Sequence, residues 1–360
     1  MSAQIYSVLA ATGSYLPENK IPNSHFQNHE FYDLDGKKLP NATDDVIRKF
    51  VKITNIQERR YASSNQMASD LGALAAENAF ESSGIDRESL DYIICAHNFG
   101  DIRDGSFRID IVPSLASRIK HKLGIKNPKT VAYDLPFGCP GWLQGVIQGN
   151  YFIKSGDAKR VMVVGTETLS RIVDPHDRDT MIYSDGAGAV ILEAVESETP
   201  VGILAQSSRS DTVTEVDFLW MGPSNKPGYA PGDLFLKMDG KKLYEYALNT
   251  VPGVITETVE KSGFQFNQIK KALMHQANGK MNEAILKRVF EQAGHDTIPE
   301  GFMPMAISWM GNNSVATIPI VLDLISKGKF EGQSLNKGET IVFASVGAGM
   351  NVNSVVYRIP

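Results

Sequence analysis

The sequence predicts an α/β protein of layered sheets and helices, organised as two similar halves. Short apolar runs rich in β-branched residues alternate with longer stretches of helical periodicity along the whole chain. This is the pattern of strands and helices that pack in layers. The order of features in residues 85–195 also recurs in residues 265–358, and such a repeat indicates a duplicated unit. We therefore expect one domain over residues 1–197 and a second over residues 198–360.

The strands are predicted from short apolar segments bounded by glycine or charge, which are typical of strands buried on both faces of a sheet. In chain order these segments are 92–96, 130–133, 161–164, 187–192, 201–204, 272–274, 340–344 and 352–357. The segments fall into two groups, one in each proposed half, so the sequence predicts two sheets.

The helices are predicted between these strands, and four of them stop at a glycine, the residue that most often follows the end of a helix. Residues 67–83 lead to Gly84, the stripe after Cys139 leads to Gly156, residues 243–262 lead to Gly263 and residues 281–293 lead to Gly294. Pro252 lies inside the third segment and is expected to kink or break it. A fifth helical stripe, 315–325, contains a proline near its start.

Composition excludes several classes of protein. The 360 residues are 42% hydrophobic and 21% charged, which suits a globular core. Thirty-six basic and 41 acidic residues give a net charge of −5, so non-specific nucleic-acid binding is not expected. No apolar run approaches the roughly 18 residues of a membrane helix. Two cysteines cannot form a disulfide framework and suit a reducing compartment, so a cytoplasmic location is expected.

The internal repeat predicts where a site would form. Residues 91–98 parallel 271–278, and the glycine-containing turn 138–141 parallels 311–314. Each of these turns is followed by a helical stripe. If the halves pack face to face, Cys139, His275 and Asn312 are expected to converge where they join.

Cys139 is the candidate nucleophile. It lies between Gly138 and the dipeptide Pro140-Gly141, and proline is favoured in the first turn of a helix. At a helix N-terminus, free N–H groups favour a thiolate. The alternative is a buried structural cysteine, which is the more common role of a lone cysteine and the one expected for Cys95, inside an apolar strand.

Cys139, His275 and Asn312 together form a set that two classes of enzyme use. One is papain-like hydrolysis, in which a histidine follows the cysteine at a comparable distance along the chain. Against this class, the local cysteine signature of that family is absent. The other is thioester chemistry, in which a thiolate exchanges with an acyl thioester. The segments 186–188 and 347–349 run into strands rather than helices, so they do not resemble phosphate-binding loops.

An ordered set of motifs resembles a known family, the β-ketoacyl-acyl-carrier-protein synthase III condensing enzymes of the thiolase superfamily. The resemblance covers almost the whole chain. It is carried by residues 163–170, 174–178 and 184–190, then by 238–240, and finally by 275–278, 311–314 and 347–350.

The resemblance implies a five-layer αβαβα thiolase-like fold, a homodimer and decarboxylative Claisen condensation. It implies that Cys139 takes the acyl group, while His275 and Asn312 bind the malonyl thioester carbonyl. The backbone N–H groups of Cys139 and Ala348 would form the oxyanion hole. The substrates would be acyl-carrier-protein or coenzyme A thioesters, without a metal or other cofactor.

Three further residues are carried over as contacts to the substrate or its carrier, namely Arg178, Asn278 and Lys280. Lys280 belongs to a basic group around the histidine motif, with Lys270, Lys271, Lys287 and Arg288. The group is interpreted either as a solvated helix face or as a docking patch for an acidic carrier protein. The second interpretation predicts that carrier-protein thioesters are preferred over coenzyme A thioesters.

The sequence departs from the family pattern at several places. Ala348 stands where the family has glycine, and residues 47–54 replace the tryptophan and arginine that clamp coenzyme A. Residues 97–111 and 29–44 are longer than in the fatty-acid enzymes. These departures resemble condensing enzymes of secondary metabolism, including those that form dialkylresorcinol-type rings. They leave the acyl chain length, the product and a second cyclising step open.

Other functions remain open at this point. A relative of the same fold would transfer acyl groups to form esters or amides without condensation. A 3-hydroxy-3-methylglutaryl-type synthase would need a catalytic glutamate, which the sequence does not place. Malonyl-dependent release of CO₂ distinguishes the condensing enzyme from the acyltransferase and from the cysteine hydrolase.

Overall fold

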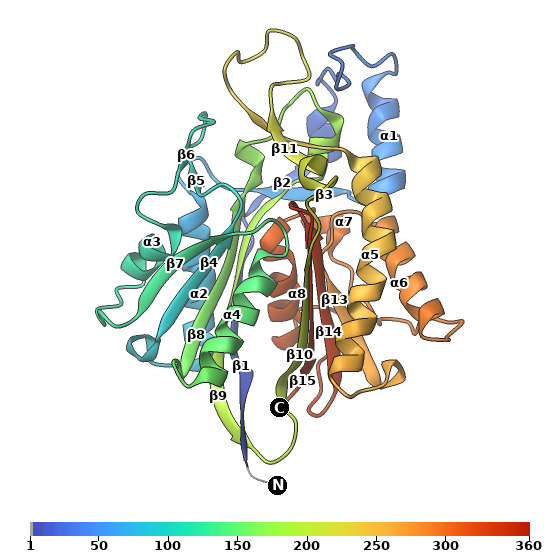
Figure 1. Cartoon of the computed structure of the whole chain (residues 1–360). Helices are drawn as coiled ribbons and strands as arrows, with labels where there is room; N and C mark the ends of the chain where they lie inside the picture. Colours follow the sequence, from blue (N-terminus) through green and yellow to red (C-terminus); the bar gives the residue numbers. More distant parts are fainter. Residues whose placement is uncertain (1–2) are drawn as a thin grey trace.

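Two sheets form the frame of the molecule in the computed structural model, which describes residues 3–360 (Figure 1). The first sheet has the strand order β1-β9-β8-β4-β7, and the second has the order β10-β15-β14-β13. The strands of the first sheet are β1 (Gln4–Tyr15), β4 (Tyr92–His97), β7 (Val131–Pro136), β8 (Arg160–Thr168) and β9 (Asp185–Ser197). Those of the second are β10 (Gly202–Ser210), β13 (Ile269–Met274), β14 (Thr340–Gly347) and β15 (Asn351–Arg358).

The two sheets repeat one topology. In the first, β9 runs antiparallel to both β1 and β8, and β8 runs parallel to β4. In the second, β15 runs antiparallel to both β10 and β14, and β14 runs parallel to β13. Strand β7 is the additional member of the first sheet and pairs with β4 alone. The duplication predicted from the repeat is therefore confirmed. All first-sheet strands end by residue 197, and all second-sheet strands begin after it.

Five layers follow from the way the helices cover these sheets (Figure 1). Helices α2 (Ala68–Ser83) and α3 (Leu115–Lys122) pack on the outer face of the first sheet. Helices α5 (Gly240–Lys261) and α6 (Gly279–Gln292) pack on the outer face of the second. Between the sheets lie α4 (Gly141–Ser155) and α8 (Thr317–Ser326), whose apolar residues share one core with both sheets. The predicted αβαβα layering is confirmed.

All eight predicted strands are present, but seven further strands within residues 3–360 were missed, most of them short. Strand β1 has small and polar residues among its apolar ones and is only partly buried, so it has no continuous apolar run. Strands β11 (Leu219–Gly222) and β12 (Phe235–Met238) form a two-stranded hairpin outside both main sheets. Short or half-exposed strands of this kind carry a weak sequence signal.

The helix predictions were correct apart from one proline. Helices α2 and α4 end at Gly84 and Gly156, both in the left-handed conformation. Helix α5, however, continues through Pro252, so of the two expected effects, a kink or a break, the break does not occur. Its buried apolar residues pack against the second sheet, and tertiary packing of this kind offsets the roughly 3 kcal/mol that an internal proline costs. Helix α8 follows the 3-10 turn η7 (Ser314–Ala316), and its proline lies in the first turn.

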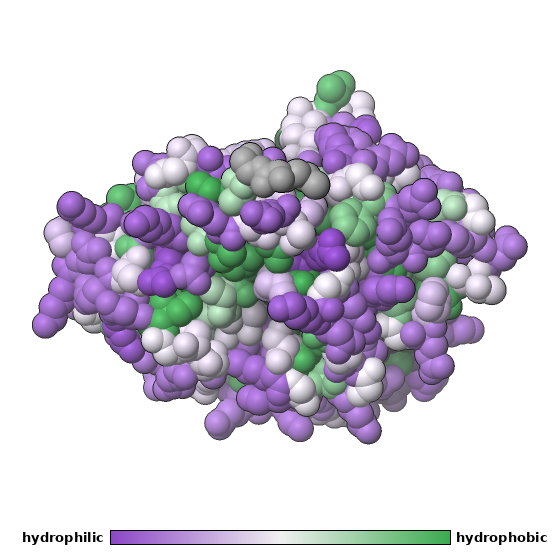
Figure 2. Space-filling model, turned by 90° about the horizontal axis from the view of Figure 1, so that it is seen from below, coloured by the Kyte–Doolittle hydropathy of each residue, from purple (hydrophilic) through white to green (hydrophobic). Residues whose placement is uncertain are grey.

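The remaining elements form an upper cap and a lateral loop. The cap contains β2 (Asn19–Pro22), α1 (Thr43–Thr54), β3 (Glu58–Tyr61), α7 (Ile307–Met310) and the β11–β12 hairpin. Strands β5 (Asp101–Ile102) and β6 (Ile109–Asp110) form the loop beside α3 (Figure 1). The opposite face, seen from below, is largely hydrophilic with separate apolar areas (Figure 2). No helix in residues 3–360 is long and apolar enough to cross a membrane.

Candidate active site

The candidate site lies between the sheets, where the starts of two central helices meet. Cys139 precedes α4 and Ser314 opens the turn that leads into α8. The two residues are 175 positions apart, yet the Cys139 Sγ and Ser314 Oγ atoms are 3.2 Å apart. Pro140 is the N-cap residue of α4, so Cys139 lies directly beside the N-cap, at the N-terminal end of the helix.

A largely apolar pocket opens beside the cysteine. Its volume is about 280 Å³. Cys139 is partly exposed toward it, whereas Cys95 is fully buried in β4. The lining residues are Asn98, Phe99, Pro136, Phe137, Gly138, Cys139, Leu169, Tyr183, Leu219, Trp220, Met221, Leu236, Ser314 and Ala348. A cavity of mostly apolar walls with one nucleophilic atom suits an acyl chain attached to that atom.

Ser314 connects the three residues that the sequence singled out, although the sequence reasoning gave it no role. Its hydroxyl contacts Cys139, and its backbone N–H donates to Asn312 Oδ1 at 2.8 Å. The Ser314 backbone also acts on the His275 imidazole and raises its pKa, as an accepting carbonyl oxygen does. Ser314 has φ = 50°, a conformation that non-glycine residues adopt at a cost of roughly 1–2 kcal/mol. These contacts hold it there, and such outliers gather at functional sites.

His275 follows β13 and is neutral in this environment. Only 5% of its surface is exposed, and burial lowers its pKa to about 4. Its Nδ1 atom has no hydrogen-bond partner within residues 3–360. The backbone is fixed because Asn282 Nδ2 donates to the His275 carbonyl oxygen at 2.8 Å. A neutral imidazole still has one N–H group, so it can donate a hydrogen bond without carrying a positive charge.

Asn312 is held with its amide in one orientation. The side chain is almost fully buried, and its Oδ1 accepts the Ser314 N–H. Because the oxygen is engaged in this way, the Nδ2 group remains as the donor. Its backbone is fixed from both sides, since the Asn312 N–H donates to the Ile182 oxygen and the Ser184 N–H donates to the Asn312 oxygen.

The thiolate expected from the helix N-terminus is not the resting state of Cys139. Desolvation raises the pKa of the Cys139 thiol to about 11, and the hydrogen bond from Ser314 opposes this rise only in part. The direction of the predicted shift was therefore wrong, because removal of solvent outweighs the helix end. The thiol needs an acceptor for its proton when it reacts.

The backbone around Cys139 closely approaches the backbone around Ala348. A Cβ on Gly347 would lie 2.7 Å from the Cys139 nitrogen, and one on Gly138 would lie 3.0 Å from the Ala348 nitrogen. Gly138 also has φ = 69°, which favours glycine. The turn carrying Ala348 is fixed by Asn351 Nδ2, which donates to the Ala348 oxygen at 2.7 Å. These close approaches explain why glycines occupy both positions and place the Cys139 and Ala348 nitrogens in neighbouring turns.

Asn98 and Glu167 stand behind the cysteine and were also missed. Asn98 Nδ2 donates to Ser314 Oγ at 2.9 Å and also to Glu167 Oε1. The backbone N–H of Asn98 donates to the same carboxylate oxygen at 3.1 Å. Glu167 is 2% exposed, and burial raises its pKa well above the usual range. Asn98 lies in a segment of the internal repeat and Glu167 in a segment that carries the family resemblance, but no sequence pattern indicated that the two residues contact each other.

The predicted carrier contacts lie outside this cluster. Arg178 is exposed at the start of the turn η4 (Arg178–Ile182), 3.6 Å from Asp179. Asn278 caps α6 by accepting the Met281 N–H, and Lys280 is exposed in the first turn of that helix. Across the described residues, no group of three or more His, Cys, Asp or Glu side chains is arranged to hold a metal ion.

Comparisons with known proteins place these observations in one family. Residues 133–212 match the family model of 3-oxoacyl-[acyl-carrier-protein] synthase III, and residues 259–359 match the model of its C-terminal part. A β-ketoacyl-[acyl-carrier-protein] synthase III of Xanthomonas campestris is 31% identical over 99% of this chain and 100% of its own length.

Solved structures agree with this match. A β-ketoacyl-[acyl carrier protein] synthase III of Thermus thermophilus superposes with a TM-score of 0.79 at 26% identity, covering 98% of this chain and 99% of that one. The priming β-ketosynthase of the R1128 polyketide pathway has a TM-score of 0.79 at 23% identity, covering 100% and 98%. At 23% identity, this second structure shows a similarity of fold only.

Proposed function

The chain belongs to the 3-oxoacyl-[acyl-carrier-protein] synthase III family, and from this premise we propose how its own residues carry out the condensation. Members of the family are acyl-transferring condensing enzymes. The observation that supports the proposal most directly is the convergence of Cys139, His275 and Asn312 on Ser314. The hydrolase alternative is not favoured, because the contact of the cysteine is Ser314 and not an imidazole.

In the first half-reaction, Cys139 Sγ attacks the carbonyl carbon of an acyl thioester. Negative charge develops on the carbonyl oxygen, where the N–H groups of Cys139 and Ala348 would stabilise it. Collapse of the tetrahedral intermediate expels the carrier thiol and leaves an acyl group on the sulfur. The apolar pocket takes the acyl chain away from water.

In the second half-reaction, a malonyl or β-ketoacyl thioester binds with its carbonyl oxygen against His275 and Asn312. For a malonyl group, the breaking C–C bond leaves its electron pair as an enolate while CO₂ departs. Two neutral donors stabilise the enolate oxygen, and each is worth roughly 3 kcal/mol. The enolate carbon then attacks the acyl carbonyl carbon and Cys139 leaves as a thiolate.

The test of this function follows both half-reactions in the wild-type protein. Incubation with a panel of acyl thioesters should add one acyl mass to Cys139, as measured by intact mass spectrometry and peptide mapping. A malonyl thioester should then release one CO₂ for each condensed product. Acylation without CO₂ release or a new carbon–carbon bond would favour the same-fold acyltransferase that forms esters or amides.

We propose that acyl-carrier-protein thioesters are the preferred donors, with Arg178 and Asn278 near the carrier arm. The positive surface that supports this proposal is smaller than the basic group predicted around the histidine motif. Arg288 Nη1 is engaged by the Leu248 oxygen at 2.8 Å, and Lys287 lies 3.7 Å from Glu291. Lys280 remains exposed with no ion pair in residues 3–360.

The neighbouring helix end adds to this patch. Gly279 packs against Thr54 and Asn55 at the end of α1, so the exposed Lys52 in the last turn of α1 lies beside the start of α6. Two lysines at adjacent helix ends form a local positive surface on a chain of net charge −5. Such a surface steers an acidic partner.

Lys280→Glu is expected to lower kcat/KM for a carrier-protein thioester by about 10-fold at low salt, with little effect on the same chain carried by coenzyme A. The loss should shrink as salt screens the charges. Lys287→Glu is the matched control, because that side chain lies two turns further along α6. Preference for coenzyme A, or a carrier reaction indifferent to salt and to Lys280→Glu, would contradict the docking surface.

We propose that two copies of the chain pair through β7. This strand is an edge of the first sheet, and Val131 is 49% exposed on it. The nearby loop exposes Ile109, Ile111 and Val112. An apolar unpaired edge favours pairing with another strand, and self-pairing about a two-fold axis satisfies both edges at once. A single species of 39.5 kDa in sedimentation equilibrium at micromolar concentration would refute the dimer.

The proposed chemistry needs no metal or prosthetic group, because both substrates are thioesters. We also propose a cytoplasmic location, since both cysteines are free thiols and thiols persist in a reducing compartment. The dialkylresorcinol-type product stays a prediction. The product of a defined pair of acyl and β-ketoacyl thioesters, identified by mass spectrometry, would test it.

A further inference from the structure

The site contains a buried acid that the two half-reactions above do not use. Glu167, at the end of β8, is 2% exposed and lies behind the Ser314 hydroxyl as seen from Cys139. The hydroxyl contacts the cysteine sulfur at 3.2 Å and also acts on the carboxyl group of Glu167. Asn98 Nδ2 reaches both Ser314 Oγ, at 2.9 Å, and Glu167 Oε1, so it holds the hydroxyl and the carboxyl group next to each other. The side chains of Cys139, Ser314 and Glu167 therefore lie in sequence, each with an exchangeable hydrogen in one of its protonation states.

The hydrogen-bonding capacity of a hydroxyl limits how this line can be arranged. Ser314 Oγ can accept two hydrogens and donate one, and Asn98 Nδ2 already donates one at 2.9 Å. With a thiol at Cys139, the S–H donates to Ser314 and the Ser314 hydroxyl donates to the Glu167 carboxylate. With a thiolate, the protonated Glu167 donates to Ser314 and Ser314 donates to the sulfur. Both arrangements use the full capacity of the hydroxyl.

We propose that Glu167 accepts, through the Ser314 hydroxyl, the proton that Cys139 loses when it takes up the acyl group. The sulfur–hydrogen bond and the Ser314 oxygen–hydrogen bond break as two new oxygen–hydrogen bonds form, on Ser314 and on Glu167. The products are a Cys139 thiolate and a neutral Glu167. When the carrier thiolate departs, Glu167 gives the proton back through Ser314 to that thiolate, which restores the carboxylate and releases the carrier as a thiol. This inference rests on the proposed acylation of Cys139.

Charge conservation favours this path in a buried site. The transfer moves one negative charge from a carboxylate to a sulfur without creating a second, and new buried charge costs several kcal/mol. His275 is a poor alternative acceptor, because burial lowers its pKa to about 4 and protonation would place a cation in the same surroundings. No hydrogen bond links the His275 ring to the Cys139 sulfur within residues 3–360.

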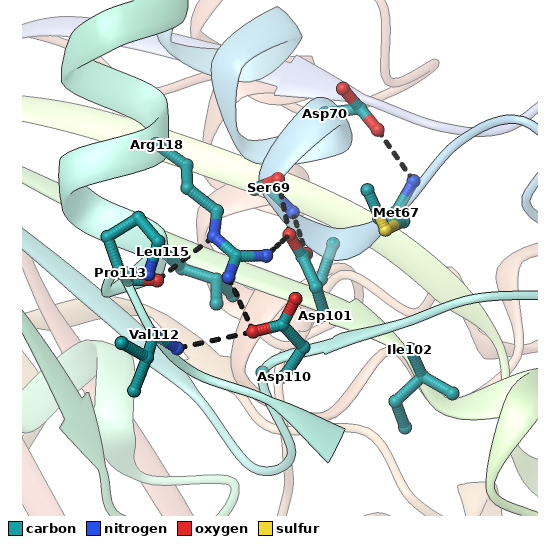
Figure 3. Close-up of polar contacts among 12 residues, drawn as sticks. Met67, Ser69, Asp70, Asp101, Ile102, Asp110, Val112, Pro113, Leu115 and Arg118 are labelled. Atoms are coloured by element: carbon teal, nitrogen blue, oxygen red, sulfur yellow. Dashed lines mark hydrogen bonds and ion pairs between the residues drawn. The ribbon is translucent and has the colours of Figure 1, made fainter. Parts of the chain in front are cut away.

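Asn98 positions both ends of the relay. It holds Glu167 with its backbone N–H and its amide, and the other amide hydrogen goes to Ser314. The chain after Asn98 is anchored by Asp101, which accepts from the Ser69 N–H and hydroxyl and from Arg118, each at 2.7 Å (Figure 3). Arg118 also reaches Asp110 on β6 (Figure 3). The relay is therefore fixed to helices α2 and α3 and does not depend on a free loop.

The titratable groups facing Glu167 set its response to pH. They are Asp185 on β9, which raises its pKa further, and the two cysteines, Cys139 and Cys95. The proposed acceptor works only when ionised, so acylation should rise with pH through the ionisation of Glu167. Without the acceptor, the rise should move to the higher range in which the thiol itself ionises.

A simple electrostatic role predicts the opposite result for one substitution. The Glu167 charge raises the pKa of Cys139, so as a mere neighbour its removal would make the thiol more acidic and more reactive at neutral pH. As a proton acceptor, its removal slows acylation. Glu167→Gln separates the two roles, because the amide oxygen can still accept from Asn98 while the group no longer takes up a proton.

The experiment measures single-turnover acylation of the full-length protein by octanoyl-coenzyme A, quenched in acid and read by intact mass, from about pH 6 to 9.5. The variants are Glu167→Gln, Ser314→Ala and the double variant, with Asp185→Asn as the control for loss of a neighbouring buried carboxylate. Melting temperatures check folding. Iodoacetamide labelling of Cys139 over the same pH range gives a second readout that needs no substrate.

Both single variants should acylate about 10- to 100-fold more slowly than wild type near pH 7, and the loss should shrink toward pH 9.5 as more of the thiol ionises by itself. The double variant should be no slower than either single one, since they interrupt one path. Asp185→Asn should not move the rise in acylation to higher pH. Faster or unchanged acylation in Glu167→Gln, an equal loss at every pH, or multiplying losses in the double variant would each overturn the relay. Wild-type protein that never acylates would instead refute the proposed function, and the labelling profile would still decide the relay.

Discussion

Cys139→Ala is expected to abolish acyl-enzyme formation, with a loss of at least about 1,000-fold in overall condensation. The sulfur is the only nucleophilic atom lining the apolar pocket apart from hydroxyl groups, and alanine offers no atom to carry the acyl chain. Decarboxylation of a malonyl thioester should continue slowly, because His275 and Asn312 remain in place. Intact mass after incubation with an acyl thioester, together with CO₂ release, measures the two effects separately.

The matched control is Cys95→Ala. Cys95 is fully buried in β4 and its pKa is raised well above the usual value, so its removal leaves the site intact and should preserve acylation. An acyl adduct that persists in Cys139→Ala, on Cys95 or elsewhere, would remove Cys139 from the mechanism and with it the function proposed here.

His275→Ala and Asn312→Ala are expected to keep acylation of Cys139 and to lose condensation by about 100- to 1,000-fold each. Both side chains are proposed donors to the enolate oxygen, and the hydrogen bond of the Cys139 sulfur within residues 3–360 goes to Ser314 rather than to either of them. Since the pKa of His275 is lowered to about 4, its imidazole is neutral at any pH well above that value. Decarboxylation should therefore show no transition from this residue between about pH 6 and 8.

Acylation measured by intact mass and decarboxylation measured by CO₂ release distinguish the two half-reactions in these variants. His121→Ala is the control for loss of a histidine, because that side chain is exposed on α3. If His275→Ala abolished acylation as completely as Cys139→Ala, a cysteine–histidine pair would be the better description, and the relay through Ser314 would fail with it.

Much of the fold could be predicted because its signals are local. The buried strands of both sheets are continuous apolar runs, and helices α2 and α4 end at glycines that adopt left-handed conformations. The duplication was visible because matching strands and turns recur in the same order. Strand β1 was missed because it is only partly buried. Pro252 was misjudged because packing of α5 on the second sheet outweighs a local preference.

The sequence by itself determined the layered architecture and the family, and it singled out three candidate site residues, since motif order and residue chemistry are properties of the chain. Only the tertiary structure decided how these residues work together. Ser314 meets Cys139 across 175 residues and Asn98 across 216, and no spacing rule reaches that far. The pKa values of Cys139, His275 and Glu167 are likewise set by burial. Burial is a property of packed surroundings, and it reversed the direction that the helix end alone had indicated for the thiol.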